Sequence, residues 1–423
     1  MDDTRAWRAG SPVLTAPDAT ITPGDIEQAR ARLRGAIRET PCAHSEPLSE
    51  LTGTRCFVKL ENLQMTGSFK ERGAANLLMQ LPPAERARGV VAASAGNHGL
   101  AVAFHAERLG IPAVIVMPEW APLIKVASAR RHGAEIVLAG ADFDEACEHA
   151  IRLGDERGLT FVHPFDDPRV IAGQGTLGLE LLEQRPDVDA VIVPVGGGGL
   201  IAGIAVAIKA RRPAVKIVGV QSEKLPAMVK SVAAGRRTRA AAAATIADGI
   251  AVREVGAHAF AIAREMVHEI VTVAEEELAN AVLRLLEIEK TVVEGAGAAP
   301  LAALLHRPLG LRGATVVLVL SGGNIDVTMV SRIIERGLVQ DDRLVRLGVI
   351  LRDRPGALAG VAALVAEERA NIVQIEHDRA FSHWVAIGET EVELTLETSG
   401  RPQIERLKSR LESAGYRVEE RRP

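Results

Sequence analysis

Thr66-Gly67-Ser68-Phe69-Lys70-Glu71-Arg72-Gly73-Ala74 places a lysine among small and aromatic residues. The turn of small residues, followed by Phe69 and Lys70, predicts a loop that enters a helix with the amine directed into a confined pocket. Burial lowers the pKa of a lysine from its ordinary value of ~10.4, which frees the amine for Schiff-base chemistry. Taken alone, a solvated lysine at a helix start is the more common arrangement, so the rest of the chain has to decide.

The composition indicates a large globular chain without a polyanionic partner. With 423 residues, 47% of them hydrophobic, the chain can bury a large core and should form two or three domains. A net charge of −4 offers no basic surface for nucleic acid or for an anionic membrane. No apolar run approaches the ~20 residues of a membrane-spanning helix, and the polar N-terminus lacks a signal-peptide core.

The cysteines indicate a compartment. Cys42, Cys56 and Cys147 are widely spaced and include no CxxC pair. This pattern predicts free thiols in a reducing cytoplasm, with no disulfide framework and no metal site. We therefore expect a cytoplasmic protein.

Most of the chain alternates between β-branched runs and alanine-rich segments. Residues 1–20 are polar and rich in proline and predict a flexible arm. Thr22-Pro23 predicts an N-cap and a first helical residue, opening a helix that extends to Arg38. From 55 to about 338, apolar strands between helices predict an α/β fold with parallel sheets covered on both faces. The clearest predicted strands are 90–93, 113–116, 190–193, 216–220 and 315–320.

The pattern changes at Gln340-Asp341-Asp342, so that residues 338–343 predict a linker. Beyond it, residues 344–423 predict a β-α-β-β-α-β series, which is a ferredoxin-like module. Alternating Glu389, Glu391 and Glu393 predict one solvated face on its long strand. The expected strands are 344–351, 371–376, 384–396 and 416–420, and the expected helices are 357–369 and 403–413.

Three glycine-rich turns follow predicted strands, where open α/β sheets bind their ligands. In Ser94-Ala95-Gly96-Asn97-His98, backbone N–H groups, the Ser94 hydroxyl and the Asn97 amide can hold a carboxylate, although an ordinary helix cap by Ser94 fits equally well. Gly196-Gly197-Gly198-Gly199-Leu200 precedes an apolar helix, whose N-terminus favours a phosphate. In Ser321-Gly322-Gly323-Asn324, the serine can share a hydrogen bond with a ring nitrogen.

The second turn has a competing interpretation. Gly197, Gly199 and Ala202 fit the dinucleotide fingerprint GxGxxA, with Glu223 near the end of the next strand, which would indicate a nicotinamide enzyme. Lys70 argues against it, because a dehydrogenase does not need a buried amine. Pyridoxal phosphate bound to an amino acid needs four groups: a lysine for its aldehyde, a cradle for the substrate carboxylate, a cradle for its phosphate and a neutral partner for its ring nitrogen. The lysine motif and the three turns supply this set.

With these residues the chain resembles the β-family (fold type II) pyridoxal-phosphate enzymes, and most closely the threonine dehydratases (threonine ammonia-lyases). The resemblance covers about residues 21–337 and implies a catalytic domain of two open parallel-sheet lobes, the small lobe (about 60–160) being inserted in the large one. The strings that carry it, besides the lysine motif and the glycine turns, are Glu61-Asn62-Leu63-Gln64, His163-Pro164-Phe165-Asp166-Asp167, Ala172-Gly173-Gln174-Gly175-Thr176, Ile246-Ala247-Asp248-Gly249 and Glu294-Gly295-Ala296-Gly297-Ala298.

The resemblance implies a role for each position. Lys70 would form the Schiff base with the cofactor and later remove the Cα proton, while Phe69 would pack on the cofactor ring. Ser321 would meet the pyridine nitrogen, and for Glu294 two roles stay open, a place in the cofactor pocket and the cap of a helix. The phosphate would lie on Gly196, Gly197, Gly198, Gly199 and Leu200, and the substrate carboxylate on Ser94, Gly96, Asn97 and His98, with Asn97 also near the cofactor's O3′.

Two positions bear on the reaction. The related serine racemases carry a second serine where this chain has Ala95, so racemisation should be poor here. The family often has glutamine at the position of Leu100, which is a departure at the carboxylate end of the site.

The C-terminal module resembles an ACT domain, a small amino-acid-sensing module that usually pairs with copies of itself. Pro355-Gly356 predicts a tight turn whose N–H groups can bind an amino-acid carboxylate. A plain capping turn in a dimerisation module stays open as the alternative. The resemblance implies isoleucine or valine as effector, held by Asp353, Pro355, Gly356, Ala357, Leu358 and Asn371.

The resemblance thus implies a pyridoxal-phosphate-dependent lyase that deaminates L-threonine, and L-serine more weakly, in a homodimer or homotetramer. Alternatives are an L-serine or 3-hydroxyaspartate dehydratase and a catalytically idle amino-acid-binding regulator. Intact Lys70, the glycine tract and Ser321 argue against the idle regulator.

Overall fold

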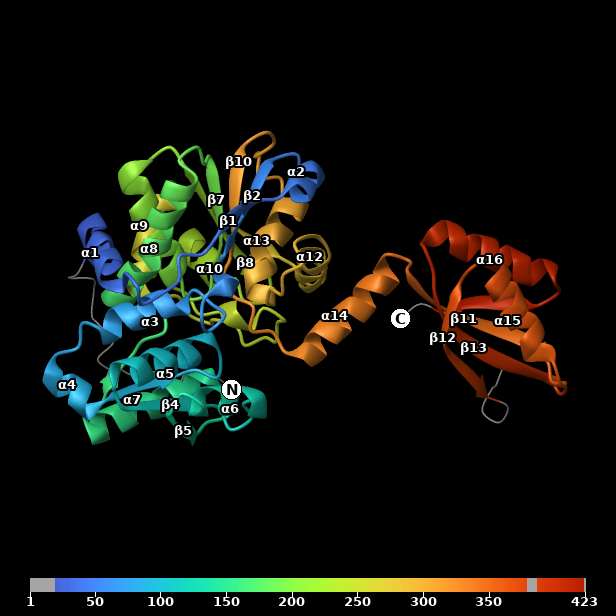
Figure 1. The fold of residues 1–423 in the computed structure, drawn as a ribbon, viewed down its shortest axis with the longest axis horizontal. Helices are drawn as coiled ribbons and strands as arrows, with labels where there is room; N and C mark the ends of the chain where they lie inside the picture. Colours follow the sequence, from blue (N-terminus) through green and yellow to red (C-terminus); the bar gives the residue numbers. More distant parts are fainter. Residues whose placement is uncertain (1–19, 379–385, 422–423) are drawn as a thin grey trace. The chain divides into compact units, whose positions relative to one another are not determined.

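The computed structural model describes residues 20–378 and 386–421 (Figure 1). These residues form two compact units, one that ends at Ile325 and one that begins at Asp326. The predicted arm, residues 1–20, lies outside the described residues except for Thr20. Within the described part of the chain, no helix is both long and apolar enough to cross a membrane.

Six strands form the larger sheet of the first unit, in the order β1-β2-β10-β7-β8-β9. Strand β1 is antiparallel to β2, and every other pair of neighbours is parallel. Strand β10, from the end of the unit's sequence, lies between β2 from its beginning and β7 from its middle. Val316 pairs with Cys56 on one side and with Ala190 on the other. The strands are β1 (Cys42–His44), β2 (Arg55–Leu60), β7 (Ala190–Pro194), β8 (Lys216–Ser222), β9 (Glu269–Val273) and β10 (Thr315–Leu320).

Helices cover both faces of this sheet (Figure 1). Val191 and Val193 of β7 belong to a hydrophobic cluster with α8 (Pro168–Gln184) and α9 (Gly199–Arg211). Helix α13 (Gly295–His306) packs against β7 and β10. Burial on both faces explains why the strands are continuous apolar runs and not alternating ones. The other helices of this lobe are α1 (Pro23–Leu33), α2 (Glu46–Thr52), α10 (Ala227–Ala234), α11 (Ala257–Met266) and α12 (Glu275–Ile288), with short helices η1 (Glu61–Leu63) and η2 (Asp248–Ile250).

A second, smaller parallel sheet has the order β5-β4-β3-β6. Alternate residues of β3 face opposite sides: Val90 and Ala92 pack in a cluster with α5, and Val91 and Ala93 pack with α7. The elements of this lobe are α3 (Lys70–Leu78), α4 (Pro83–Arg88), β3 (Val90–Ala93), α5 (Asn97–Leu109), β4 (Ala113–Met117), α6 (Leu123–Arg130), β5 (Glu135–Leu138), α7 (Phe143–Arg157) and β6 (Thr160–Phe161). The predicted α/β fold of two open parallel-sheet lobes is confirmed.

The second unit begins with α14 (Val327–Gln340), which includes three residues of the predicted linker. The series after it is β11 (Leu344–Arg352), α15 (Ala357–Glu367), β12 (Asn371–Asp378), β13 (Glu389–Glu397), α16 (Arg401–Ser413) and β14 (Arg417–Arg421). Its antiparallel sheet has the order β12-β13-β11-β14, which is the predicted ferredoxin-like arrangement. On β13, Val392 and Leu394 are buried in the core, and Glu391 and Glu393 form ion pairs with Arg421 and Arg346.

Two predicted boundaries are wrong by more than two residues. Thr22 caps α1 and Pro23 is its first residue, as predicted, but the helix ends at Leu33 and not at Arg38, because Gly35 adopts a positive φ of 76°. Strand β13 begins at Glu389 and not at 384, since residues 386–388 form a turn with Gly388 at φ 92°. Residues 384 and 385 lie outside the described part of the chain.

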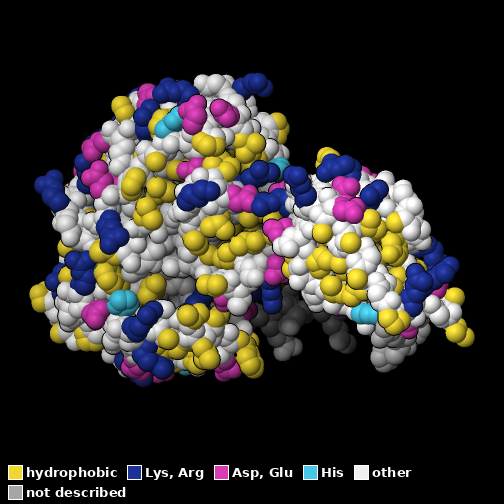
Figure 2. Space-filling model, turned by 45° about the vertical axis from the view of Figure 1, so that its right-hand side comes forward, with side chains coloured by type: hydrophobic (Ala, Val, Ile, Leu, Met, Phe, Trp, Pro, Cys, Tyr) yellow, Lys and Arg dark blue, Asp and Glu magenta, His cyan; other side chains and the backbone are white. Residues whose placement is uncertain are grey.

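Apolar side chains also reach the surface of the second unit. Figure 2 shows hydrophobic side chains gathered on the face of this unit that is turned to the viewer. On the edge strand β12, Val373 and Ile375 are 58% and 41% exposed. An exposed edge strand with apolar side chains is a surface on which another strand can pair.

Candidate active site

Lys70 is the first residue of α3, and the loop before it is held against the end of β10. The Phe69 N–H donates to the Ser321 carbonyl at 3.0 Å, and the Gly323 N–H donates to the Gly67 carbonyl at 2.9 Å. Ser68 and Gly322 form an isolated β-bridge between these bonds. Two predicted site segments, about 250 residues apart in sequence, are therefore joined directly.

The Lys70 amine has an unusual environment. Its side chain is half-buried, and Nζ donates to the Pro164 carbonyl at 2.7 Å. Burial lowers the pKa of Lys70 to about 8, while the Glu294 carboxylate opposes this shift. An amine with this pKa is partly neutral near pH 7.5, and the neutral amine is the form that attacks a carbonyl.

Helix α3 is anchored by buried charges that the sequence analysis did not identify. The Arg72 guanidinium donates to both carboxylate oxygens of Glu61 at 2.7 Å, and its Nη1 lies 2.9 Å from Glu180. Arg72 and Glu61 are both 0% exposed. Burial opposes the ionisation of Glu61, but Arg72 outweighs it and holds the pKa of Glu61 below its ordinary value. The bidentate pair fixes the helix two residues beyond Lys70.

The glycine tract turns from β7 into α9. Gly198 has a φ of 97°, which only glycine adopts readily, and a Cβ at Gly197 would lie 2.3 Å from the Phe165 ring. Among the described residues, none accepts a hydrogen bond from the N–H groups of residues 197–200. A bend of free N–H groups at a helix N-terminus is a cradle for a phosphate.

Phe165 and Pro164 connect this cradle to the lysine, since the segment 163–167 contacts both. The Asp166 carboxylate accepts from the N–H groups of Ala257 and His258, at 2.7 and 3.1 Å, and so caps α11. Leu200, by contrast, is only 5% exposed, and its side chain belongs to the core beneath the loop. Only its backbone can contribute to the cradle.

The turn 94–98 lies between β3 and α5. Ser94 Oγ accepts from the Gly96 N–H at 3.1 Å, while the N–H groups of Asn97 and His98 donate to no group that the structure describes. The His98 ring is buried, with Nε2 2.9 Å from the Val162 carbonyl, and burial lowers its pKa to about 3. The neutral ring therefore donates to this carbonyl, so the Nε2–H of His98 is not available to a substrate carboxylate.

Asn97 is joined to two residues of the other lobe. Its Nδ2 donates to Glu294 Oε1 at 2.7 Å, and its Oδ1 accepts from Asn324 Nδ2 at 2.7 Å. Burial, and next Asp248, raise the pKa of Glu294 to about 7. Of the two roles open for Glu294, the helix cap is not made: the residue occupies the N-cap position of α13, but its side chain makes no capping bond and accepts from Asn97 instead. Asn324 belongs to the predicted glycine-rich turn that begins at Ser321, but the sequence predicted no role for it.

Ser321 is 2% exposed, and its hydroxyl forms no hydrogen bond with the described residues. A buried neutral hydroxyl with a free donor and acceptor suits a ring nitrogen. The structure thus brings Lys70, Asn97 and Ser321 together, and Phe165 places the glycine tract beside them.

The predicted effector residues belong to the second unit. Gly356 has a φ of 87° and precedes α15, and the Asp353 N–H donates to the Gly388 carbonyl at 2.9 Å. Ala357 and Leu358 pack partly against the core of this unit. Asn371 Nδ2 donates to Glu397 on the neighbouring strand at 3.3 Å. Pro355 lies in the same turn as Gly356.

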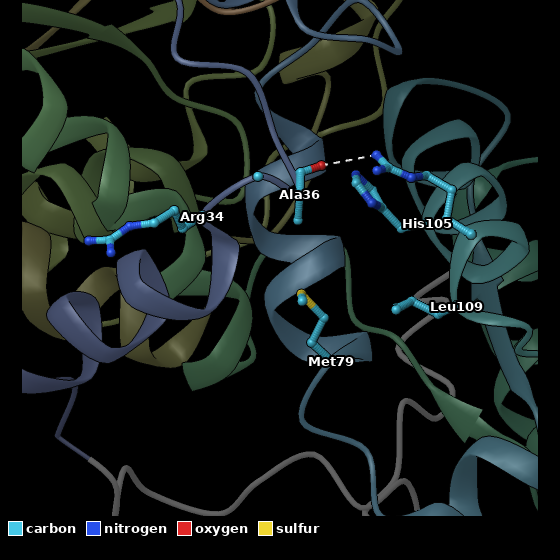
Figure 3. A pocket seen from close by; sticks show the side chains of 7 residues that line it. Arg34, Ala36, Met79, His105 and Leu109 are labelled. Atoms are coloured by element: carbon cyan, nitrogen blue, oxygen red, sulfur yellow. Dashed lines mark hydrogen bonds between the residues drawn. The ribbon is translucent and has the colours of Figure 1, made fainter.

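A pocket that is open to solvent lies in the first unit away from these residues (Figure 3). The turn after α1, Met79 and the C-terminal part of α5 line it, and Arg108 Nη1 donates to the Ala36 carbonyl at 3.2 Å. In Figure 3 the Arg34 side chain points away from this opening. The pocket contains none of the predicted site residues.

Comparison with known proteins places this geometry in a family. The sequence profile of the family described as pyridoxal-phosphate dependent enzyme matches residues 33–322. The chain belongs to this family. Residues 345–415 match the ACT domain. The predicted cofactor, pyridoxal phosphate, and the predicted pair of modules are confirmed, and the nicotinamide interpretation is set aside.

The pyridoxal-phosphate enzyme has close relatives. It is 50% identical to an L-threonine ammonia-lyase of Thermotoga maritima over 398 residues, which are 94% of this chain and 99% of that protein. The processed threonine deaminase isoform 2 of Solanum lycopersicum is 36% identical, with a TM-score of 0.70 over 75% of this chain and 95% of that one. Maize serine racemase is 33% identical, with a TM-score of 0.72 over 76% and 99%.

Proposed function

We propose that this pyridoxal-phosphate enzyme is a threonine ammonia-lyase, which converts L-threonine to 2-oxobutyrate and ammonia and acts more weakly on L-serine. The observation that carries the proposal is the 50% identity to the L-threonine ammonia-lyase of Thermotoga maritima across nearly both whole chains. The presence of Lys70, Asn97 and Ser321 in one hydrogen-bonded site argues against an idle regulator.

The residues present fit the cofactor. The free N–H groups of residues 197–200 would hold its phosphate, the unpaired Ser321 hydroxyl would meet its ring nitrogen, and Asn97 would offer an N–H to its phenolic oxygen. Phe69, whose ring centroid is 5.3 Å from Lys70 Nζ, would pack on the ring. When bound, pyridoxal phosphate supplies an electron sink for the charge that develops at Cα.

The chain supplies binding and proton transfer. The Asn97 and His98 N–H groups, with Ser94 and Gly96, would bind the substrate carboxylate at the N-terminus of α5. Lys70 would take the Cα proton, and its pKa of about 8 places the neutral amine within reach at physiological pH. The Ser321 hydroxyl cannot keep the ring nitrogen protonated as a carboxylate would, which favours prompt loss of the β-hydroxyl over racemisation.

The overall reaction balances without an oxidant. The Cα–H and Cβ–O bonds of L-threonine break, and the hydroxyl leaves as water. The released aminocrotonate takes up one water and yields 2-oxobutyrate and ammonia. This elimination needs no redox cofactor.

The test combines absorbance and product. The purified protein should be yellow, its visible band should shift when L-threonine is added, and 2-oxobutyrate should form in the same cuvette. Lys70→Ala should abolish both the band shift and turnover, because it removes the amine that would hold the cofactor and take the Cα proton; retained turnover would refute the mechanism. A band shift without oxo acid would redirect the assignment to another β-elimination or replacement substrate, with L-serine and 3-hydroxyaspartate assayed next.

We also propose that the ACT domain binds a branched-chain amino acid at the turn formed by Asp353, Pro355 and Gly356, and thereby regulates a cytoplasmic homodimer or homotetramer. This turn is exposed at the N-terminus of α15, where helix N–H groups can bind a carboxylate, and this supports the proposed site. Deletion of residues 342–423 should leave threonine turnover intact and remove any response to isoleucine. Loss of all activity would instead assign the domain a structural role.

A further inference from the structure

We propose that Glu294 is a positioning residue that fixes the Asn97 carboxamide, so that Asn97 presents a hydrogen-bond donor to the cofactor. The inference rests on the proposed place of Asn97 beside the cofactor. It concerns four residues from separate parts of the first unit, namely Thr66, Asn97, Glu294 and Asn324. We call this chain of hydrogen bonds the amide relay.

The orientation of Asn97 follows from a backbone carbonyl. The Thr66 carbonyl can only accept, so the Asn324 atom 2.7 Å away must be its NH₂ group. The second hydrogen of that NH₂ group points to Asn97, which must therefore turn its Oδ1 toward Asn324 at 2.7 Å. The Asn97 NH₂ group then faces Glu294, which accepts one of its two hydrogens at 2.7 Å.

One Asn97 hydrogen is left over. An amide NH₂ group has two donors, and the relay uses only one of them. Asn97 is half-buried at the start of α5, so the second donor is available to a ligand. Without Glu294, the NH₂ end has no acceptor in the relay and the amide loses the partner that opposes its rotation.

The Glu294 side chain does not cap its own helix. Its side chain is 4% exposed and makes no capping bond to α13, although it stands at the N-cap position. A Cβ at Gly322 would lie 2.6 Å from Glu294 Oε1 and 3.2 Å from Asn97 Nδ2. Residue 322 must therefore be glycine for the two side chains to meet.

The charges around Glu294 leave its acceptor role intact in either protonation state. Asp248 of η2 faces it with a like charge, while Lys125 of α6 and Lys70 of α3 face it with the opposite charge. Burial raises the pKa of Glu294 to about 7, so that both forms of the carboxyl are populated near neutral pH. A carboxylate oxygen and the carbonyl oxygen of a carboxylic acid both accept from an amide N–H. Glutamine, which offers the same carbonyl oxygen, is accordingly a close substitute.

The experiment is a double-mutant cycle read by cofactor binding. Cofactor-free full-length wild type, Glu294→Ala, Glu294→Gln, Asn97→Ala and the double variant Glu294→Ala/Asn97→Ala are titrated with pyridoxal phosphate and followed by visible absorbance. Glu183→Ala, on α8 and paired with Arg30 at the surface, is the matched control. Thermal unfolding of each variant shows whether it is folded.

Glu294→Ala is expected to weaken cofactor binding about tenfold, as for the loss of one buried hydrogen bond, and to move the visible band as Asn97→Ala does. The double variant should be no weaker than Asn97→Ala alone, because the two residues act as one unit. Glu294→Gln should bind within about twofold of wild type.

Binding of Glu294→Ala equal to that of Glu183→Ala would overturn the inference, as would additive losses in the double variant. A wild type that takes up no pyridoxal phosphate would refute the proposed function. A wild type that binds normally, together with a Glu294→Ala variant that binds equally well, would refute only the role of Glu294. If Glu294→Ala does not fold, Asn324→Ala interrupts the relay from its other end and enters the cycle instead.

Discussion

The depressed pKa of Lys70 has a measurable consequence for stability. Lys70→Met removes an amine that burial holds at a pKa of about 8, against 10.5 for the ordinary side chain. The folded state therefore binds fewer protons than the unfolded chain between these values. The stability of the wild type rises as pH increases from about 8 to 10.5, and the full penalty applies below about 8.

The magnitude follows from the same two values. The difference between 10.5 and about 8 corresponds to roughly 3 kcal/mol at about 1.4 kcal/mol per pKa unit. Methionine has a similar length and no charge, but it loses the bond from Nζ to the Pro164 carbonyl, which costs about 1 kcal/mol. Cofactor-free Lys70→Met should thus be about 2 kcal/mol more stable than wild type at pH 7, and nearly equal to it at pH 9.5.

Thermal unfolding followed by circular dichroism, on protein freed of cofactor, measures this difference. We expect the melting temperature of Lys70→Met to exceed that of wild type by roughly 3 °C at pH 7, with the gain shrinking to below about 1 °C at pH 9.5. Lys209→Met is the control, because Lys209 Nζ also donates to backbone carbonyls, those of Pro213 and Val215, outside the site. A Lys70→Met protein that is less stable than wild type at pH 7, or a gain that does not change with pH, would refute the reasoning.

Three further variants test other parts of the structure. Gly197→Ala places a Cβ 2.3 Å from the Phe165 ring and should weaken pyridoxal-phosphate uptake at least tenfold in a cofactor titration. Gly24→Ala, whose Cβ would lie 3.5 Å from its nearest neighbour, should leave uptake unchanged. An equal effect of the two substitutions would speak against the close approach of Gly197 to Phe165. Arg72→Met leaves the buried Glu61 carboxylate without its guanidinium partner and should lower the free energy of unfolding by about 3–5 kcal/mol, measured by heat or urea. Arg30→Met, in an ion pair at the surface, should lower it by under about 1 kcal/mol. Similar losses would mean that the buried pair is not the anchor of α3. Ala95→Ser supplies a hydroxyl where related serine racemases carry one, and chiral chromatography of the reaction with L-serine should then detect D-serine, which wild type should not form.

Features that depend on near neighbours in the chain were predictable. The apolar β-branched runs predicted the inner strands β3, β4, β7, β8 and β10 of the two sheets, because strands buried on both faces must be apolar throughout. Thr22 and Pro23 predicted the start of α1, but its end was placed five residues late, since only the backbone conformation at Gly35 ends the turn. The glycine tract and Lys70 were recognisable because their chemistry needs particular residue types side by side.

Contacts across the fold were not predictable in this way. Glu294 and Asn97 are 197 residues apart in the chain, and only the packing of α13 beside the turn before α5 turns the glutamate away from its helix and toward the amide. His98 was predicted to help hold a substrate carboxylate, but nothing in the sequence shows that its ring bonds to the Val162 carbonyl.

By itself, then, the amino-acid sequence determined the alternation of strands and helices, the two modules and the lysine and glycine motifs, because periodicity, turn chemistry and small residues act over short distances. Only the tertiary structure decided the pKa of Lys70, the buried pair of Arg72 with Glu61 and the partner of Asn97. These properties depend on desolvation and on hydrogen bonds between distant segments, and both exist only after the lobes have packed.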